Sequence, residues 1–374
     1  MSFFVPYANL AHEAAAIKAP LFSACERVIL SGRYILGPEL AAFEREFADF
    51  CGTRFAVGTS SGTAALLITL RAFGWPAAAE VITVANSFVA TTAAIVLAGA
   101  KPVFVDVGDD GNIDPGSIEA AITGHTRAIL PVHLTGRPAK MREIAGIAER
   151  HGLVVIEDAA QAVGASLGGK RVGGFGDAAC FSLNPLKNLH AYGDGGVITT
   201  DDEVLYRRLL QGRNHGLIDR ERCEFFSFNC RLDELQAALV RAQLPLLDEW
   251  TEIRRQAAFR YNELLAAFGE VPAERAGEYC VYQTYVLKVD SRDALQRHLR
   301  ENGVEALVHY ATAIDQQPAA AGFAQSHNGL PKTRAHVKRI LSLPLYPGIS
   351  LAQQERVAEL VSGFSSRKPG ARSI

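Results

Sequence analysis

The chain has 374 residues, of which 48% are hydrophobic and 21% are charged, and its formal net charge at pH 7 is −2. This length and composition indicate a globular protein of more than one domain. Because the net charge is close to zero, there is no electrostatic basis for expecting a nucleic acid or an anionic membrane surface as a partner.

The N-terminal sequence and the cysteines bear on where the protein works. The chain starts without a basic segment before an apolar run, so we expect no signal peptide. The most apolar segment, residues 85–100, carries polar side chains and is too short to cross a bilayer. Six cysteines are scattered without a CxxC pair, which predicts reduced thiols in a cytoplasmic protein and no metal site.

The first half of the chain alternates short apolar runs with helical patterns. Apolar spacing predicts helices near residues 11–31 and 38–50. Strands are then expected at residues 56–58, 81–84, 102–106, 128–132 and 153–156, and helices at residues 62–73, 90–98, 115–121 and 140–150. This βαβ alternation predicts a mostly parallel sheet that is covered by helices on both faces.

The pattern changes near residue 200. Helices are expected at residues 203–210, 233–247, 249–267 and 293–301, with a strand at residues 282–289. We therefore predict an α/β chain with a large domain at residues 1–248, which includes the N-terminal segment, and a smaller α+β domain at residues 249–374. Residues 365–370 are predicted to be disordered.

Two motifs, residues 154–161 and 181–188, carry the chemistry. In the first, an apolar strand ends in Asp158, and ligands of parallel sheets bind outside such strand ends. In the second, Lys187 follows an apolar run and precedes the glycine-rich residues 193–196. Pyridoxal phosphate (PLP) requires an amine for its aldehyde, an acid for its ring nitrogen and donors for its phosphate. Taken singly, Lys187 could be a surface lysine and Asp158 a helix cap.

A candidate phosphate site lies earlier in the chain. Ser61, Gly62 and Thr63 follow a predicted strand and open a helix, and a helix N-terminus with free N–H groups binds anions. Simple capping explains the same residues. The chain has no Walker A motif, and no GxGxxG follows a strand. Phe88 could stack on a ring, although an aromatic residue in an apolar stretch is commonly core.

Together these motifs resemble the fold type I PLP enzymes and, among them, the DegT/StrS-type nucleotide-sugar aminotransferases. The resemblance extends from about residue 32 to residue 347. It rests on five segments in order: residues 60–63, 157–161, 181–189, 193–196 and 229–238. Each segment is weak alone, and their order and spacing together carry the resemblance.

The resemblance implies a role for each motif residue. Lys187 would bind the cofactor covalently and move the proton, and Asp158 would pair with the ring nitrogen. The remaining cofactor contacts would come from Ser61, Gly62, Thr63, Phe88, Gln161 and Ser182, and from Asn229 of the other subunit of a homodimer. Tyr34, His309 and Tyr310 are the candidate substrate-binding residues. The implied reaction moves an amino group from glutamate or glutamine to a keto-sugar.

Some positions depart from the family pattern and leave alternatives open. Relatives often carry His-Tyr-Pro-x-Pro-x-His where this chain has residues 309–315, which lack both prolines and the second histidine. Gln283 replaces a frequent histidine, and Ser227 a frequent glycine. The alternatives are a PLP-dependent sugar dehydratase, an aminotransferase for another keto compound such as a cyclitol, and a non-catalytic PLP-binding regulator. Lys187 favours transamination, because dehydratases of this family carry histidine there.

Overall fold

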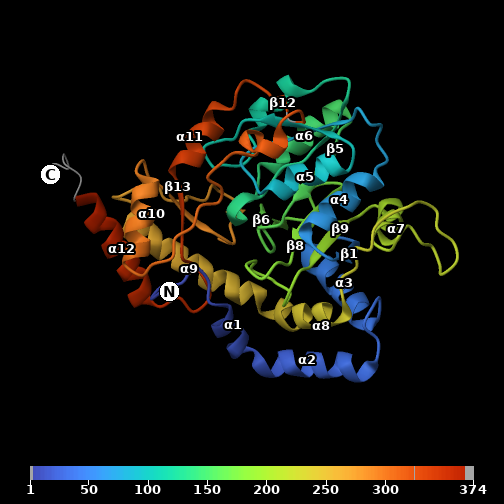
Figure 1. Ribbon diagram of the computed structural model, residues 1–374, viewed down its shortest axis with the longest axis horizontal. Helices are drawn as coiled ribbons and strands as arrows, with labels where there is room; N and C mark the ends of the chain where they lie inside the picture. The colour runs from blue at the N-terminus through green and yellow to red at the C-terminus, as the bar shows by residue number, and fades with distance from the viewer. Residues whose placement is uncertain (1–2, 324, 367–374) are drawn as a thin grey trace.

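The computed structural model describes residues 3–323 and 325–366 of the chain. A large sheet between helices forms one body, and a smaller body of helices around a short sheet packs beside it (Figure 1). Within the described ranges, no helix combines the length and the hydrophobicity that crossing a bilayer requires. Most of the tail that we predict to be disordered lies outside the described residues, and residues 365 and 366 end the last helix.

In the described part of the chain, the large sheet has eight strands, and seven of them run in the same direction. Their order across the sheet is β1 (Phe55–Thr59), β9 (Gly196–Thr200), β8 (Ala178–Ser182), β5 (Val154–Asp158), β4 (Thr126–Ile129), β2 (Glu80–Val84), β3 (Lys101–Val105) and β12 (Gln325–Ser326). β9 is antiparallel to both of its neighbours. The predicted mostly parallel α/β sheet is confirmed.

Helices pack on both faces of this sheet. Those of the larger body are α1 (Leu10–Ala16), α2 (Lys18–Ser31), α3 (Pro38–Cys51), α4 (Gly62–Ala72), α5 (Val89–Leu97), α6 (Met141–His151), α7 (Glu203–Gly212) and α8 (Glu234–Gln243). Successive residues of β8 face opposite layers, as the period of a strand requires. Ala179 and Phe181 join the cluster with α3 and α8, while Ala178 and Cys180 join the cluster with α4 and α7. Both faces are therefore buried.

The smaller body is built on two antiparallel strands, β11 (Tyr285–Lys288) and β13 (Ile340–Leu343). Its helices are α9 (Leu247–Leu265), α10 (Arg292–Glu301) and α12 (Leu351–Ser366), while α11 (Pro331–Arg339) lies between β12 and β13. A third, three-stranded sheet is formed by β6 (Ser166–Leu167), β7 (Lys170–Arg171) and β10 (Glu278–Tyr279).

Two short segments pass between the bodies. Val5, near the N-terminus, packs in the core of the smaller body and pairs with Val304. In the other direction, β12 extends the large sheet beside β3. The domain boundary between residues 248 and 249 stays a prediction. Each of the two predicted domains contributes one of these segments to the body formed mainly by the other domain.

Several predicted elements differ from the structure. The helix expected at residues 11–31 is divided at Ile17 into α1 and α2, and the end of the helix expected at residues 233–247 is the 3₁₀ turn Leu244–Leu246. The helix expected at residues 115–121 is a pair of 3₁₀ turns, Pro115–Ser117 and Glu119–Ala121, because so short a segment gains few hydrogen bonds for the cost of starting an α-helix. The strand expected from residue 282 begins at Tyr285 instead. Tyr282 has a φ of 44°, which is incompatible with an extended strand.

A buried carboxylate fixes the loop beneath β5. Glu157 is fully buried, and its carboxylate accepts hydrogen bonds from the backbone N–H groups of Gly173, Phe175 and Gly176. His133 Nε2 lies 2.9 Å from Glu157 Oε2. Burial raises the pKa of Glu157, but these hydrogen bonds outweigh it and bring the pKa below its usual value.

We expect the substitution Glu157→Ala to lower the free energy of unfolding by roughly 3–5 kcal/mol, because three backbone N–H groups and buried His133 lose their acceptor. Thermal or denaturant unfolding measures this loss. Glu149→Ala, on the exposed side of α6, is the matched control and should change stability by less than about 0.5 kcal/mol. An equal effect of both substitutions would show that Glu157 does not stabilise the loop.

Candidate functional site

Four strands that run in the same direction lead to one cavity of about 360 Å³. Asp158 and Ser182 are the last residues of β5 and β8, while Ser61 and Ser87 follow β1 and β2. Parallel strands bring their carboxyl ends to one edge of the sheet, and this edge is where α/β proteins bind ligands. The alternation of strands and helices therefore gathers residues that lie far apart in the sequence.

Lys187 reaches this cavity from the loop between β8 and β9. Asn184 shapes the turn, since its carbonyl accepts from the N–H of Lys187 and its side chain accepts from the N–H of Leu186. The side chain of Asn188 anchors the loop by donating to the carbonyl of Val281 at 3.0 Å. Burial lowers the pKa of Lys187 to about 8, against the opposing effect of Asp158. The amine is thus held where it readily loses its proton.

Asp158 faces the same cavity with both oxygens engaged. Oδ2 accepts from the Thr91 hydroxyl at 2.7 Å, and Oδ1 accepts from the N–H of Ala160 at 3.2 Å. Burial raises the pKa of Asp158, while these donors and Lys187 oppose the rise. A cation beside this carboxylate would stabilise its charged form, and a protonated ring nitrogen is such a cation.

The N-terminus of α4 lines the same cavity and suits a phosphate. Ser61 caps the helix by accepting from the N–H of Ala64 at 3.1 Å. Within the described ranges, the N–H groups of Gly62 and Thr63 donate no hydrogen bond. A Cβ at Gly62 would lie 2.8 Å from Cβ of Ser182, so glycine permits the two segments to approach. Free N–H groups and the nearby hydroxyls form an anion-binding cradle.

Aromatic and polar side chains form the wall of the cavity. The rings of Phe88 and Tyr310 lie 5.6 Å apart. Gln161 accepts from the N–H of Thr135 at 2.6 Å and points Nε2 at the Tyr310 hydroxyl, 3.3 Å away. Nδ1 of His309 lies 2.9 Å from the Ser342 hydroxyl, and burial with nearby Lys187 lowers the pKa of His309 to about 4. His309 therefore lines the cavity as a neutral imidazole.

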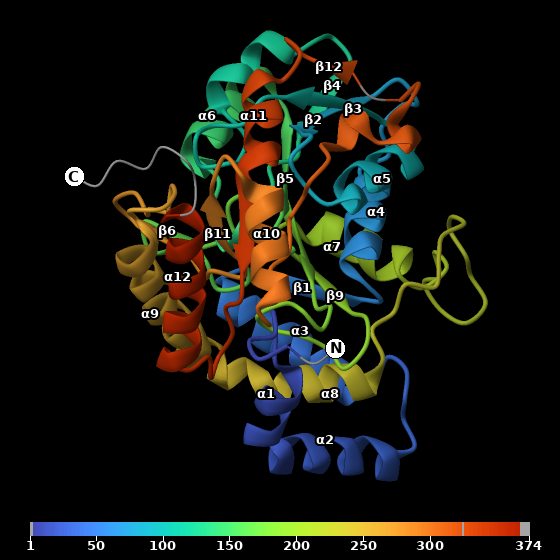
Figure 2. The same ribbon diagram turned by 60° about the vertical axis from the view of Figure 1, so that its left-hand side comes forward.

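The cavity contains most of the predicted site residues. Those that line it are Ser61, Gly62, Thr63, Phe88, Asp158, Gln161, Ser182, Lys187, His309 and Tyr310. Two predicted residues lie outside it. Tyr34 is more than half exposed and donates to the carbonyl of Ile29, and Asn229 is exposed in the loop after α7. Figure 2 shows this loop projecting from the body of the molecule, as Figure 1 does.

Sequence reasoning missed several lining residues, and three of them bring hydroxyl groups to the cavity. Tyr7 arrives from the N-terminal segment, and its hydroxyl lies 3.3 Å from that of Thr284. Ser87 and Thr91 bring hydroxyls from the start of α5. The i, i+4 spacing of Ser87 and Thr91 was the available signal, whereas nothing local to the sequence around Tyr7 indicates its position.

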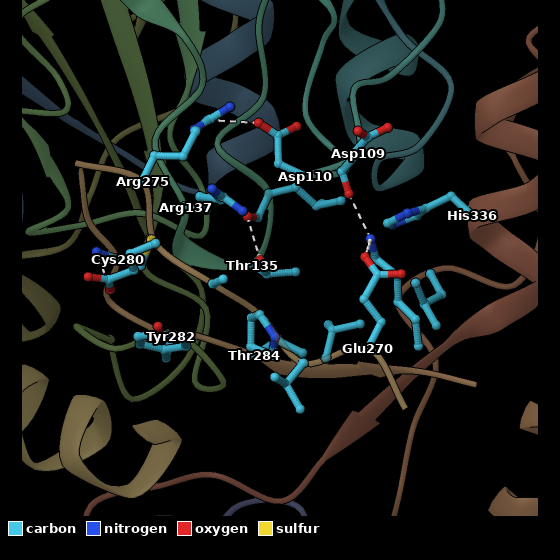
Figure 3. A pocket seen from close by; sticks show the side chains of 18 of the residues that line it. Asp109, Asp110, Thr135, Arg137, Glu270, Arg275, Cys280, Tyr282, Thr284 and His336 are labelled. Carbon is cyan, nitrogen blue, oxygen red and sulfur yellow. Dashed lines mark hydrogen bonds and ion pairs between the residues drawn. The ribbon is translucent and has the colours of Figure 1, made fainter. Parts of the chain in front are cut away.

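A larger cavity of about 430 Å³ lies between the two bodies, and Figure 3 shows its lining. Its charged side chains largely neutralise one another. Arg275 pairs with Asp110 at 2.8 Å, and Lys288 pairs with Glu270 at 2.7 Å. Because these charges already have partners, this cavity offers less to a charged ligand than the smaller one does.

Comparison with known proteins gives a consistent result. The model of the DegT/DnrJ/EryC1/StrS aminotransferase family matches residues 16–362. A protein of Geobacillus stearothermophilus named as a pleiotropic regulatory protein is 42% identical, over 96% of this chain and 98% of the relative. The dTDP-3-amino-3,4,6-trideoxy-alpha-D-glucose transaminase of Streptomyces venezuelae is 39% identical, over 97% of both chains.

A solved structure is similar over the whole fold. The crystal structure of Streptomyces venezuelae DesV in complex with a ketimine intermediate aligns with a TM-score of 0.95 at 39% identity, over 99% of this chain and 100% of that chain.

The lowered pKa of Lys187 can be measured in cofactor-free protein. Burial disfavours the ammonium form, so the reactive free amine should appear as the pH rises through about 8, whereas an ordinary lysine requires about 10.4. In competitive labelling with trace acetic anhydride, Lys187 should reach half of its maximal rate near pH 8. Exposed Lys101 serves as the internal control. A midpoint for Lys187 at or above that of Lys101 would contradict this expectation.

Proposed function

This chain belongs to the DegT/DnrJ/EryC1/StrS aminotransferase family and has the fold type I architecture, and we propose that it is a PLP-dependent transaminase of keto-sugars. It takes an amino group from glutamate or glutamine and transfers it to a nucleotide-linked keto-deoxysugar. The observation that carries the proposal is a buried amine, Lys187, and a buried carboxylate, Asp158, that line one cavity with a phosphate cradle.

The donor set of the cavity fits PLP. Lys187 would hold the aldehyde carbon covalently, and Asp158 would accept from the protonated ring nitrogen. The first turn of α4 and Ser182 would bind the phosphate, with Ala160 and Phe88 beside the ring and Gln161 near its hydroxyl. When bound, PLP supplies an electron sink that makes the α-carbon of an attached amino acid acidic.

The chain's own residues would move one proton. Lys187, whose pKa of about 8 lies near neutral pH, would act as the general base that takes the proton from the donor's α-carbon. Asp158 would hold the ring nitrogen in its protonated form. Neutral His309 and Tyr310 line the cavity beside Lys187, where a substrate would meet them.

The name of the Streptomyces venezuelae relative, a transaminase of a dTDP-linked sugar, supports a nucleotide-sugar as the acceptor. The altered segment after Tyr310 bears on which keto compound fits. Of the two positions where relatives often carry proline, Ala313 is buried in a cluster with Ile314 and Phe104, and Ala311 is exposed.

A regulatory role is the second candidate, because the Geobacillus relative is named as a pleiotropic regulatory protein. A protein that only senses the cofactor needs its phosphate cradle. It does not need a base with a lowered pKa opposite a buried carboxylate, and catalysis needs both. The arrangement of Lys187 and Asp158 therefore favours the enzyme.

A homodimer with shared sites forms part of the proposal. Large apolar side chains are exposed near the cavity and on the loop after α7, including Phe88 at 52% and Phe226 at 93%. Exposed apolar surface of this kind marks an interaction site, and a second copy would cover it while bringing Asn229 to the phosphate. We place the enzyme in the cytoplasm, in keeping with six cysteines that form no disulfide.

The half-reaction tests the proposed function. Protein loaded with PLP and mixed with glutamate or glutamine should convert the cofactor to its amine form, which absorbance follows. Lys187→Ala should slow this conversion by at least about 10²–10⁴-fold, because it removes the base. Lys101→Ala, at an exposed position, should retain the wild-type rate.

Two results would count against the proposed function. No conversion with any amino donor would favour the regulator, and conversion without subsequent turnover of any nucleotide-linked keto-sugar would favour another keto acceptor or a dehydratase.

Mixed dimers test the shared site. Lys187→Ala and Asn229→Ala should each be inactive alone. Equal mixing should restore about a quarter of wild-type activity, because half of the dimers are mixed and each of these holds one intact site. Mixing Lys187→Ala with Asp158→Asn is the control and should restore nothing, since both residues line the cavity of one chain. Equal recovery in both mixtures, or a fully active Asn229→Ala, would contradict the arrangement.

A further inference from the structure

A short chain of buried hydroxyls connects the start of α5 to the carboxylate of Asp158. The Thr91 hydroxyl lies 2.7 Å from Asp158 Oδ2, and the Ser87 hydroxyl lies 2.8 Å from that of Thr91. All three side chains are nearly inaccessible to solvent. We infer that Thr91, supported by Ser87, is a positioning residue that holds Asp158 in the orientation that its partnership with the PLP ring nitrogen requires. This inference rests on the function proposed above.

The direction of the hydrogen bonds follows from the chemistry of the groups. An ionised carboxylate can only accept, so Thr91 donates its proton to Asp158. The oxygen of Thr91 is then free to accept from the Ser87 hydroxyl, and a donor that itself accepts a hydrogen bond is polarised and donates more strongly. Ser87 therefore strengthens the contact that Thr91 makes.

Thr91 also fixes the rotation of the carboxyl group. Backbone hydrogen bonds from Asp158 to Pro131 and from His133 to Asp158 hold the main chain, but they leave the side chain free to turn. Its two oxygens are held by Thr91 on one side and by the N–H of Ala160 on the other. Losing one of two donors to a buried charge releases the group and removes a strong, charge-assisted bond.

Other titratable groups near Asp158 do not replace Thr91. They are Lys187, His133, Tyr310 and Cys180. Throughout the described part of the chain, none of the four side chains donates a hydrogen bond to the carboxylate. Among the groups that stabilise the charged form of Asp158, Thr91 has the largest effect on its pKa, ahead of Ala160 and Lys187.

The adjacent residue Thr92 offers a matched control. It is buried like Thr91, but its hydroxyl has no hydrogen-bond partner among the residues that the structure describes. Thr92→Val therefore removes a buried hydroxyl from the same turn of α5 without touching Asp158, and Thr91→Ser keeps the donor while it removes a methyl group.

The test compares wild type, Thr91→Val, Thr91→Ser, Ser87→Ala and Thr92→Val, each loaded with PLP that carries ¹⁵N in the ring. The ¹⁵N chemical shift reports protonation of the ring nitrogen directly. Thr91→Val should lower the pH at which this nitrogen loses its proton by at least about one unit. It should also slow the glutamate half-reaction about ten- to a hundredfold, because this factor corresponds to the free energy of one hydrogen bond to a charged group. Ser87→Ala should do the same to a smaller extent.

Thr91→Ser and Thr92→Val should match wild type in both measurements. A wild-type nitrogen signal and rate in Thr91→Val would overturn the inference and leave the proposed function intact. An equal loss in Thr92→Val would also overturn it, because packing would then explain the effect. If Thr91→Val fails to fold, Ser87→Ala and Thr92→Val are compared instead. A lower nitrogen pKa and a slower half-reaction in Ser87→Ala alone would support the inference, and equal values in both variants would overturn it. A wild-type protein that binds no PLP would instead refute the proposed function on which the inference rests.

Discussion

The rest of the site depends on a buried carboxylate opposite a buried amine. Removing Asp158 and Lys187 from water raises the pKa of one and lowers that of the other, so each lies closer to its neutral form than on the surface. Such an arrangement costs stability unless a charged ligand completes it. The fold accepts this cost at one cavity, whereas the larger cavity between the bodies has its charges paired internally. Buried ionisable groups with shifted pKa values are characteristic of functional sites.

The sheet separates a structural carboxylate from a functional one by a single residue. Glu157 and Asp158 are neighbours on β5, and alternation along a strand sends them to opposite faces. Glu157 accepts hydrogen bonds from three backbone N–H groups of the loop below, and its Oε2 lies 2.9 Å from Nε2 of His133. Asp158 faces the cavity with two donors and no salt bridge in the described structure. One acid thus fixes the end of β5 so that the other can bind a ligand there.

The sequence was sufficient for those features that local chemistry determines. Strands with continuous apolar runs and the helices after them were placed to within a few residues, and Lys187, Asp158 and the first turn of α4 meet at one cavity as the motifs predicted. Tyr7 and Thr91 could not be found this way, since their roles depend on contacts with Thr284 and Asp158, far away in the chain. Tyr282 shows the same limit, because its residue type gives no sign of the positive φ that it adopts. Tyr34 and Asn229, carried over from the family, lie outside the cavity of one chain, and their roles stay predictions.

The most direct test of the central claim is to identify the side chain that binds the cofactor. Protein incubated with PLP, reduced with borohydride and digested can be mapped by mass spectrometry. The account predicts one pyridoxyl group, on the peptide that contains Lys187. Stoichiometric labelling of a different lysine, or an unlabelled protein after incubation with excess PLP, would contradict it.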